Sequence, residues 1–213
     1  GKDTLNDVAI RWQVLHNGKV LLSDSLRTDL LPQGQVVSCG KVGFPLGLFA
    51  GKAAQLQIVL SAPSLGIGNQ YNVWVYPENH PDEPANVTIA REATPELLKS
   101  IEDGATVLLV PKSKYDGERM TFATPFWSTL MFDYQPKTMG IVCNPAHPVF
   151  ADFPTDFHSD WQWWELTTNT WAARINDTPI DYRPMLQVID HPVRNDKLGA
   201  IMETRIGKGR LLI

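Results

Sequence analysis

Apolar and polar residues alternate along the first third of the chain, with the period of two that is typical of β-strands. One face of the segment 8–15 collects, in order, Val8, Ile10, Trp12 and Val14. The dipeptide Asn17-Gly18 follows and favours a tight turn into a returning strand. Further strands are expected at 34–38 and 55–61. Short alternating strands without a helical period predict a small β-sandwich.

The pattern changes after residue 71. Strands are expected at 72–76 and 87–90, and Thr94-Pro95-Glu96 has the residue types that begin a helix. The continuous apolar run at 105–110 is typical of a strand covered on both faces, as in a parallel sheet. Strand, helix and buried strand in this order predict a βαβ unit.

The last third repeats the buried-strand pattern at 139–143 and 185–189, with a helix expected between them at 160–168. Gly207-Lys208-Gly209 separates two short apolar segments and predicts a terminal hairpin. The sequence given stops inside an apolar segment, which we interpret as truncation of an α/β domain.

Charge and hydropathy narrow the range of partners. The 213 residues carry a formal net charge of −4, and the Lys and Arg residues are spread singly along the chain. A nucleic-acid partner is therefore not expected. No window reaches the roughly 18 consecutive apolar residues that a transmembrane helix requires, so no membrane span is expected either.

The residues that could perform catalysis occur in ordinary contexts. The carboxylates considered as a glycosidase pair are Asp152, Asp156, Asp160 and Glu165. Acidic residues before and early in a helix are common caps, so no catalytic residue is predicted among them. The histidines and cysteines show none of the spacings of a metal site, and no cofactor motif is present.

Cys143 follows an apolar run and precedes His147, which invites comparison with a nucleophile and its base. The small residues of a nucleophile elbow are missing, and Pro145 prevents a helix that would bring the two side chains together. We therefore predict a buried cysteine at a strand end and a loop histidine. Cys39 and Cys143 are expected to be small buried side chains without a disulfide.

Four of the seven tryptophans fall within eleven residues, between Trp161 and Trp171. On a helix Trp161 and Trp164 share a face, while Trp163 points elsewhere. We expect Trp161 and Trp164 to be packing residues and at least one ring of the cluster to lie outside the core, and exposure of Trp163 would distinguish a ligand contact from packing. Flat rings with a polar N–H suit sugar faces, so Trp163, with His158 and Glu165 nearby, is the candidate ligand contact. Packing of the whole cluster against the sheet is the favoured alternative.

Several segments together resemble the C-terminal region of large bacterial family 2 glycoside hydrolases of the β-galactosidase-like type. The matching segments are His147-Pro148, Asp152-Phe153-Pro154-Thr155, His158-Ser159-Asp160-Trp161-Gln162-Trp163-Trp164-Glu165-Leu166, Tyr182-Arg183-Pro184 and Gln187-Val188-Ile189-Asp190. Asn72-Val73-Trp74-Val75-Tyr76-Pro77 and the β-rich stretch before it resemble the immunoglobulin-like module that precedes that region.

The resemblance implies an all-β immunoglobulin-like sandwich at 1–71, followed at 72–213 by an α/β flavodoxin-like domain of the class I glutamine amidotransferase type. The chain lacks the barrel that carries the catalytic glutamates of family 2 enzymes. It is therefore expected to be a non-catalytic accessory fragment that packs against the catalytic barrel and other domains of a parent glycosidase. The family resemblance also implies a periplasmic or outer-surface location.

Two alternative functions stay open. The first is a carbohydrate-binding module that uses the Trp161–Trp171 aromatic cluster. The second is a stand-alone amidotransferase-like hydrolase that uses Cys143. The sugar substrate and linkage do not follow from the sequence under any of the three readings.

Overall fold

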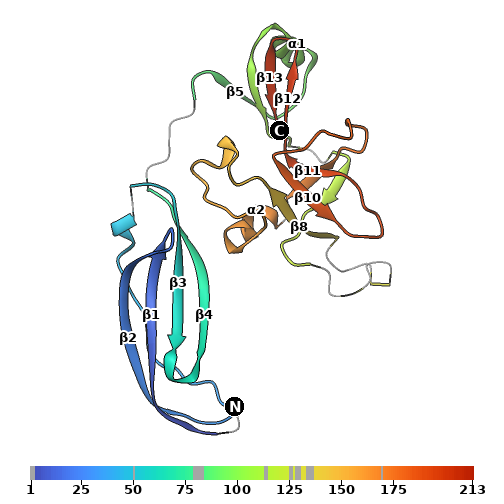
Figure 1. Ribbon diagram of the computed structural model, residues 1–213. Helices are drawn as coiled ribbons and strands as arrows, with labels where there is room; N and C mark the ends of the chain where they lie inside the picture. Colours follow the sequence, from blue (N-terminus) through green and yellow to red (C-terminus); the bar gives the residue numbers. More distant parts are fainter. Residues whose placement is uncertain are drawn as a thin grey trace. The chain divides into compact units, whose positions relative to one another are not determined.

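The computed structural model describes residues 3–49, 51–78, 84–112, 115–124, 127, 131–132, 137–168 and 170–213. The chain divides into two compact units, which are Gly1–Asn79 with Asp152–Pro154, and His80–Ala151 with Thr155–Ile213. Within the described residues the strands form three sheets, one in the first unit and two in the second (Figure 1). In the part of the chain that the structure describes, helical structure is confined to two short α-helices and four single 3₁₀ turns.

The first unit is built on one antiparallel sheet in the order β2-β1-β3-β4. Its strands are β1 (Leu5–His16), β2 (Lys19–Leu31), β3 (Ala54–Ala62) and β4 (Ile67–Val75). The β1–β2 turn is formed by Asn17 and Gly18, both with positive φ, which is the backbone of a type I′ hairpin turn. The hairpin that the Asn-Gly dipeptide predicted is confirmed.

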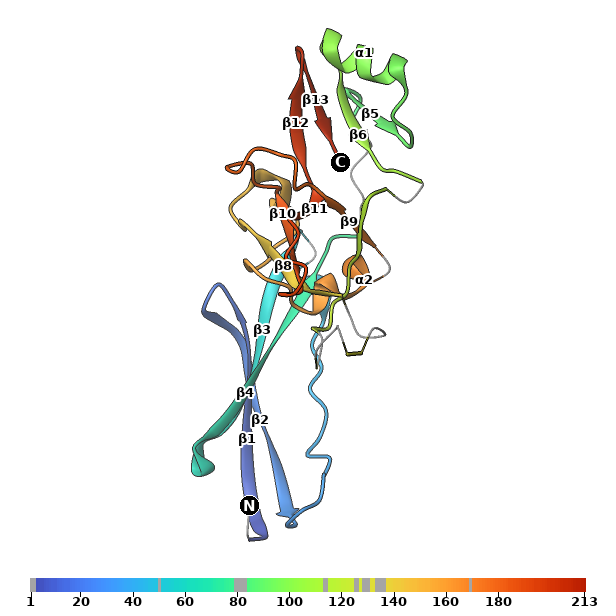
Figure 2. The same ribbon diagram turned by 90° about the vertical axis from the view of Figure 1, so that its right-hand side faces the viewer.

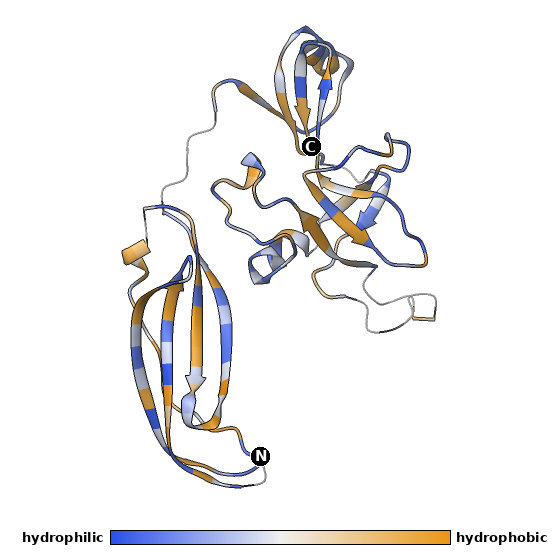
Figure 3. Cartoon of the chain, in the orientation of Figure 1, coloured by the Kyte–Doolittle hydropathy of each residue, from blue (hydrophilic) through white to orange (hydrophobic). Residues whose placement is uncertain are grey.

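One face of this sheet carries the core of the first unit. Val14 and Leu56 are fully buried, and Trp12 and Val73 pack around them. Phe44, from the connection between β2 and β3, packs against the same cluster, and its ring meets that of Phe49 edge-on. Figure 3 shows the alternation of hydropathy along the strands that produces this one-sided core.

The immunoglobulin-like sandwich predicted for the N-terminal part is wrong, because the described residues of the first unit form one sheet rather than two packed sheets. The connection between β2 and β3 covers the apolar face in place of a second sheet. This connection contains Gly34, Gly40 and Pro45 and forms only the 3₁₀ turn η1 (Leu46–Phe49) in its described part. Glycine and proline disfavour strand pairing, and the strand expected at 34–38 is absent.

The smaller sheet of the second unit contains the predicted βαβ unit. Its elements are β5 (Val87–Ala90), α1 (Pro95–Asp103), β6 (Thr106–Leu109), β12 (Glu203–Ile206) and β13 (Gly209–Leu212). The strand order is β12-β13-β6-β5, with β5, β6 and β13 parallel and β12 antiparallel. Thr94 Oγ1 caps α1 by accepting from the backbone N of Leu97 at 3.2 Å, and Ile101 buries the helix against the sheet. The βαβ unit and the terminal hairpin are confirmed.

The larger sheet is antiparallel throughout and has the order β7-β9-β11-β10-β8. Its strands are β7 (Gly117–Arg119), β8 (Thr138–Cys143), β9 (Trp171–Arg174), β10 (Leu186–Asp190) and β11 (Leu198–Ile201). Figure 2 shows β11 leading directly into the β12–β13 hairpin of the smaller sheet. The connection from β8 to β9 contains η3 (Pro148–Phe150), η4 (Trp161–Trp163) and α2 (Trp164–Thr167).

The flavodoxin-like domain of the amidotransferase type is therefore also wrong. The segments 139–143 and 185–189 are strands, as expected, but they pair antiparallel as β8 and β10 in a sheet of their own. Met139 and Val142 of β8 are exposed by 37% and 41%, so this strand is not covered on both faces. An apolar run indicates a strand, but it does not determine the direction in which the strand pairs.

Candidate functional site

The aromatic cluster lies on a short helical segment formed by η4 and α2. Asp160 begins this segment, because its Oδ1 accepts from the backbone N of Trp161 at 2.7 Å and its carbonyl accepts from the backbone N of Trp163 at 2.8 Å. A helix was predicted at 160–168, and the structure confirms its position. The segment starts as a 3₁₀ turn and continues as one α-turn.

Trp163 is the interior residue of the cluster. Its side chain is only 3% exposed, and its Nε1 donates to Thr155 Oγ1 at 2.8 Å. Its ring meets Phe150 edge-on, with centroids 6.1 Å apart. The hypothesis that Trp163 is an exposed ligand contact is therefore wrong, and its burial agrees with the favoured alternative of packing. Its N–H finds a partner inside the protein, which allows a tryptophan to be buried without an unpaired donor.

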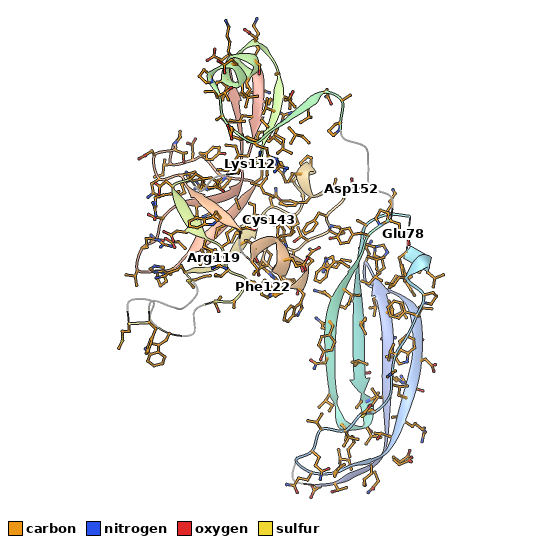
Figure 4. All side chains as sticks on the ribbon, turned by 180° about the vertical axis from the view of Figure 1, so that it is seen from behind. Glu78, Lys112, Arg119, Phe122, Cys143 and Asp152 are labelled. Atoms are coloured by element: carbon orange, nitrogen blue, oxygen red, sulfur yellow. The ribbon has the colours of Figure 1, made fainter. Side chains whose placement is uncertain are left out.

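Trp161 and Trp164 are exposed by 68% and 49%, although packing in the interior was predicted for both. Their spacing of three residues places them on one side of the helical segment, as expected. The ring of Trp161 lies against that of Phe122, with centroids 5.5 Å apart and planes inclined by 31°. Figure 4 shows Phe122 beside this segment. We call Trp161, Trp164 and Phe122 the aromatic surface.

The sequence did not indicate that Phe122 belongs to this surface, because it lies about forty residues before the tryptophans, in an irregular stretch after β7. No periodicity links such a residue to a helix elsewhere in the chain. The periodic pattern correctly paired Trp161 with Trp164, but it could not indicate which side of the segment faces the core.

The two other candidate ligand contacts, His158 and Glu165, are both exposed. His158 forms an isolated bridge to Val142 of β8, and its Nδ1 lies 3.1 Å from the carbonyl oxygen of Ser159. Its ring meets that of Phe157 edge-on at 4.8 Å, and Phe157 is itself 62% exposed. Glu165 lies in the first turn of α2, next to Trp164 in the chain.

Trp171 belongs to a different part of the unit. It begins β9, pairs with Arg119 of β7, and its carbonyl accepts from the hydroxyl of Tyr115 at 3.0 Å. It is therefore a residue of the larger sheet and does not extend the helical cluster.

Cys143 is buried at the end of β8, as predicted (Figure 4). Its Sγ donates to the backbone oxygen of Asp156 at 3.4 Å. Burial raises the pKa of this thiol, and the nearby carboxylate of Asp156 raises the pKa further. His147 is engaged elsewhere, since its Nδ1 accepts from the backbone N of Val149 at 3.2 Å. Burial and the carboxylate of Asp156 both disfavour the thiolate of Cys143, which is the nucleophilic form.

Both cysteines are free, as predicted, although Cys39 is only half-buried. Of the carboxylates considered as a catalytic pair, Asp160 is a helix cap, as expected, and Asp152 and Glu165 are exposed. Within the described ranges, no group of three or more His, Cys, Asp and Glu side chains could hold a metal ion. No helix there is long and apolar enough to cross a membrane.

A charged network that sequence reasoning missed joins β7, β9 and the loop after β10. Its members are Asp116, Glu118, Arg174, Asp190, Arg194 and Asp196. Arg174 donates to Asp196 at 2.6 Å, to Glu118 at 3.0 Å and also to Asp116. These contacts, the Asp196 hydrogen bond first, raise the pKa of Arg174.

Asp190 is the innermost carboxylate of this network, with a side chain only 1% exposed. Burial alone would raise its pKa, but hydrogen bonds from Arg194 and from the backbone N atoms of Asp196 and His191 outweigh burial and lower it. The network is spread over residues 116–196, so no local motif could have indicated it.

The family matches follow the division into two units. Residues 88–213 match the family described as domain of unknown function DUF8487, which is more than half of the chain, and the chain therefore belongs to this family. Residues 1–77 match a second domain of unknown function, DUF8488. No curated protein matches the chain. Neither family description names an activity.

Proposed function

We propose that the chain is an accessory module of a carbohydrate-degrading enzyme and that it binds polysaccharide on the aromatic surface. The observation that carries the proposal is the 68% exposure of Trp161, whose ring is held against Phe122. Trp164 adds a second exposed ring on the same side of the segment. Exposed apolar residues that lie together, unlike single ones, mark sites of interaction with a partner.

The chemistry of the aromatic surface suits sugars. The faces of a pyranose ring present C–H groups that pack on a flat aromatic ring, while its hydroxyls stay available to water and polar side chains. The cap formed by Asp160 fixes the backbone of Trp161, and Phe122 restricts its ring. A ring that is already fixed loses little conformational entropy on binding.

The accessory role rests on the resemblance of 147–190 to the C-terminal region of family 2 glycoside hydrolases. In this proposal a longer protein supplies the catalytic barrel, and the module keeps the polysaccharide near it, in the periplasm or at the outer cell surface. The alternative that uses Cys143 is not favoured, because burial and Asp156 hold the pKa of the thiol above its ordinary value.

Binding to insoluble and soluble polysaccharides tests the proposal, by pull-down and by affinity electrophoresis with a panel of galactans, xylans and β-glucans. Stacking contacts of about 0.5–1.5 kcal/mol per ring predict that Trp161→Ala weakens binding about twofold to tenfold. Trp161→Ala combined with Trp164→Ala should weaken it further.

The matched control is Trp127→Ala, which removes a ring that is 59% exposed and lies outside the helical segment. This variant should bind like the wild type. Equal binding by the wild type and the double variant, or no binding to any polysaccharide of the panel, would contradict the proposed function.

A further inference from the structure

A cleft of about 570 Å³ lies in the second unit, at the carboxyl ends of its three parallel strands. Arg91 directly follows β5, Leu109 ends β6, and Ile213 directly follows β13, so all three line the cleft at this edge of the sheet. The opposite wall comes from Asp116, before β7, and from β9 of the larger sheet. Crevices at the carboxyl ends of parallel strands are where open α/β sheets bind ligands. The volume is within the range of small-molecule sites.

The cleft has an apolar floor and a polar rim. Leu109 and Met202 line it and are each only 8% exposed, so their apolar surface continues the core. Tyr115 adds a ring whose hydroxyl is already committed to the carbonyl of Trp171, which holds the ring in place. The rim is formed by the exposed side chains of Arg91, Glu92 and Asp116. This combination fits a ligand with one apolar face and several polar groups.

The charges at the cleft decide between ligand classes. Arg174 also lines it, but Asp116, Glu118 and Asp196 all accept from this guanidinium. Its positive charge is therefore more than balanced, and the single cation of Arg91 is matched by Glu92. An anion such as a phosphate group would meet no net positive potential here. A neutral ligand with hydroxyl groups would find carboxylates that accept hydrogen bonds and a guanidinium that donates them.

We propose that this cleft is a second binding site, which takes the free end of a sugar chain or a free mono- or disaccharide. The C–H face of the sugar packs on Tyr115, Leu109 and Met202, and its hydroxyls bond to Arg91, Glu92 and Asp116. The choice of sugar over other neutral polar ligands rests on the proposed function. The location and the preference for a neutral ligand rest on the cleft alone.

Titration of the whole chain with galactose, glucose, lactose and cellobiose tests the site, followed by amide chemical shifts and by calorimetry. We expect shifts at Arg91, Glu92 and Asp116. Ala93→Trp fills the cleft from an exposed loop and should weaken sugar binding at least tenfold. Ala85→Trp is the matched control, since Ala85 is exposed in the turn at the opposite end of β5 and should leave binding unchanged.

Inorganic phosphate and adenosine monophosphate serve as anionic probes and should bind more weakly than the sugars. Tighter binding of either anion, or sugar binding that survives Ala93→Trp, overturns the proposal. Shifts confined to the indole signals of Trp161 and Trp164 overturn the cleft and leave the proposed function standing. Loss of sugar binding in Ala93→Trp, with polysaccharide binding indifferent to Trp161→Ala, supports the cleft and refutes the aromatic surface.

Discussion

The Nε1 atom of Trp163 donates a hydrogen bond of 2.8 Å to Oγ1 of Thr155, eight residues earlier in the chain. This bond anchors the irregular connection after β8 to the helical segment that follows it. The bond satisfies the N–H of the middle tryptophan, which is interior, while Trp161 and Trp164 on either side of it are exposed.

Removing the acceptor of this hydrogen bond should destabilise the second unit. Thr155→Val removes the hydroxyl that accepts from the buried N–H of Trp163, and we expect a loss of about 1–3 kcal/mol in the free energy of unfolding. Urea unfolding followed by tryptophan fluorescence measures it. Thr155→Ser keeps the hydroxyl and should cost less, so equal losses for the two substitutions would contradict this reading.

Asp190→Asn should cost about 2–3 kcal/mol of unfolding free energy at neutral pH, because charge-assisted hydrogen bonds from Arg194 are lost. Folding lowers the pKa of Asp190. Its contribution to the free energy of unfolding is therefore fully present above the ordinary aspartate pKa of about 4. The contribution disappears as the pH falls through the lower pKa of the folded state.

The difference in stability between Asp190→Asn and the wild type should therefore be largest near neutral pH and should shrink below about pH 4. Chemical unfolding at several pH values measures it. Asp177→Asn, at an exposed site, is the control and should follow the wild type throughout. A difference that grows on acidification would show that the network does not act as described.

The two cysteines should differ in reactivity. Burial and the carboxylate of Asp156 raise the pKa of Cys143, whereas Cys39 is half-buried in the connection between β2 and β3. Iodoacetamide should therefore label Cys39 before Cys143 in the native protein, as followed by peptide mass spectrometry. The two should react at similar rates in urea. Faster labelling of Cys143 in the folded state would revive the nucleophile hypothesis.

Gly209 has no room for a side chain. A Cβ added there would overlap with the backbone oxygens of Ile101 and Ala105. Ile101 belongs to α1 and Ala105 follows its C-terminal end, so neither oxygen can move without disturbing the backbone there. Gly209→Ala should lower the unfolding free energy of the second unit by about 1–3 kcal/mol or more. Gly43→Ala, where the added Cβ meets open space, should be nearly neutral in the same chemical unfolding assay.

Local signals in the sequence predicted local structure well. The hairpin at Asn17-Gly18, the capped helix after Thr94 and the terminal hairpin around Lys208 all depend on residues within a few positions of one another. Backbone preferences and capping act at that range, so one sequence contains the necessary information.

Sheet assembly depends on partners that are distant in the chain, and there the sequence was insufficient. The alternation around Val14 indicates that one face is buried, but a connection containing Phe44 buries it as well as a second sheet would. The spacing of Trp161 and Trp164 likewise indicates a shared side without indicating which side faces water. The rim of the cleft joins Arg91 to Asp116 across two sheets, beyond the reach of any motif.

The position of β13 has a consequence for the order in which the second unit folds. This strand lies between β6 and β12, and it pairs with β6 across about one hundred residues of intervening chain. During synthesis, β5, α1 and β6 emerge long before the strand that completes their sheet. The backbone N atoms of Lys208 and Arg210 also donate hydrogen bonds to the carbonyls of Glu102 and Ala105, near the C-terminal end of α1. Closure of so long a loop makes folding slow. On the ribosome, the βαβ unit should therefore have an unpaired edge at β6 until the β12–β13 hairpin has been synthesised.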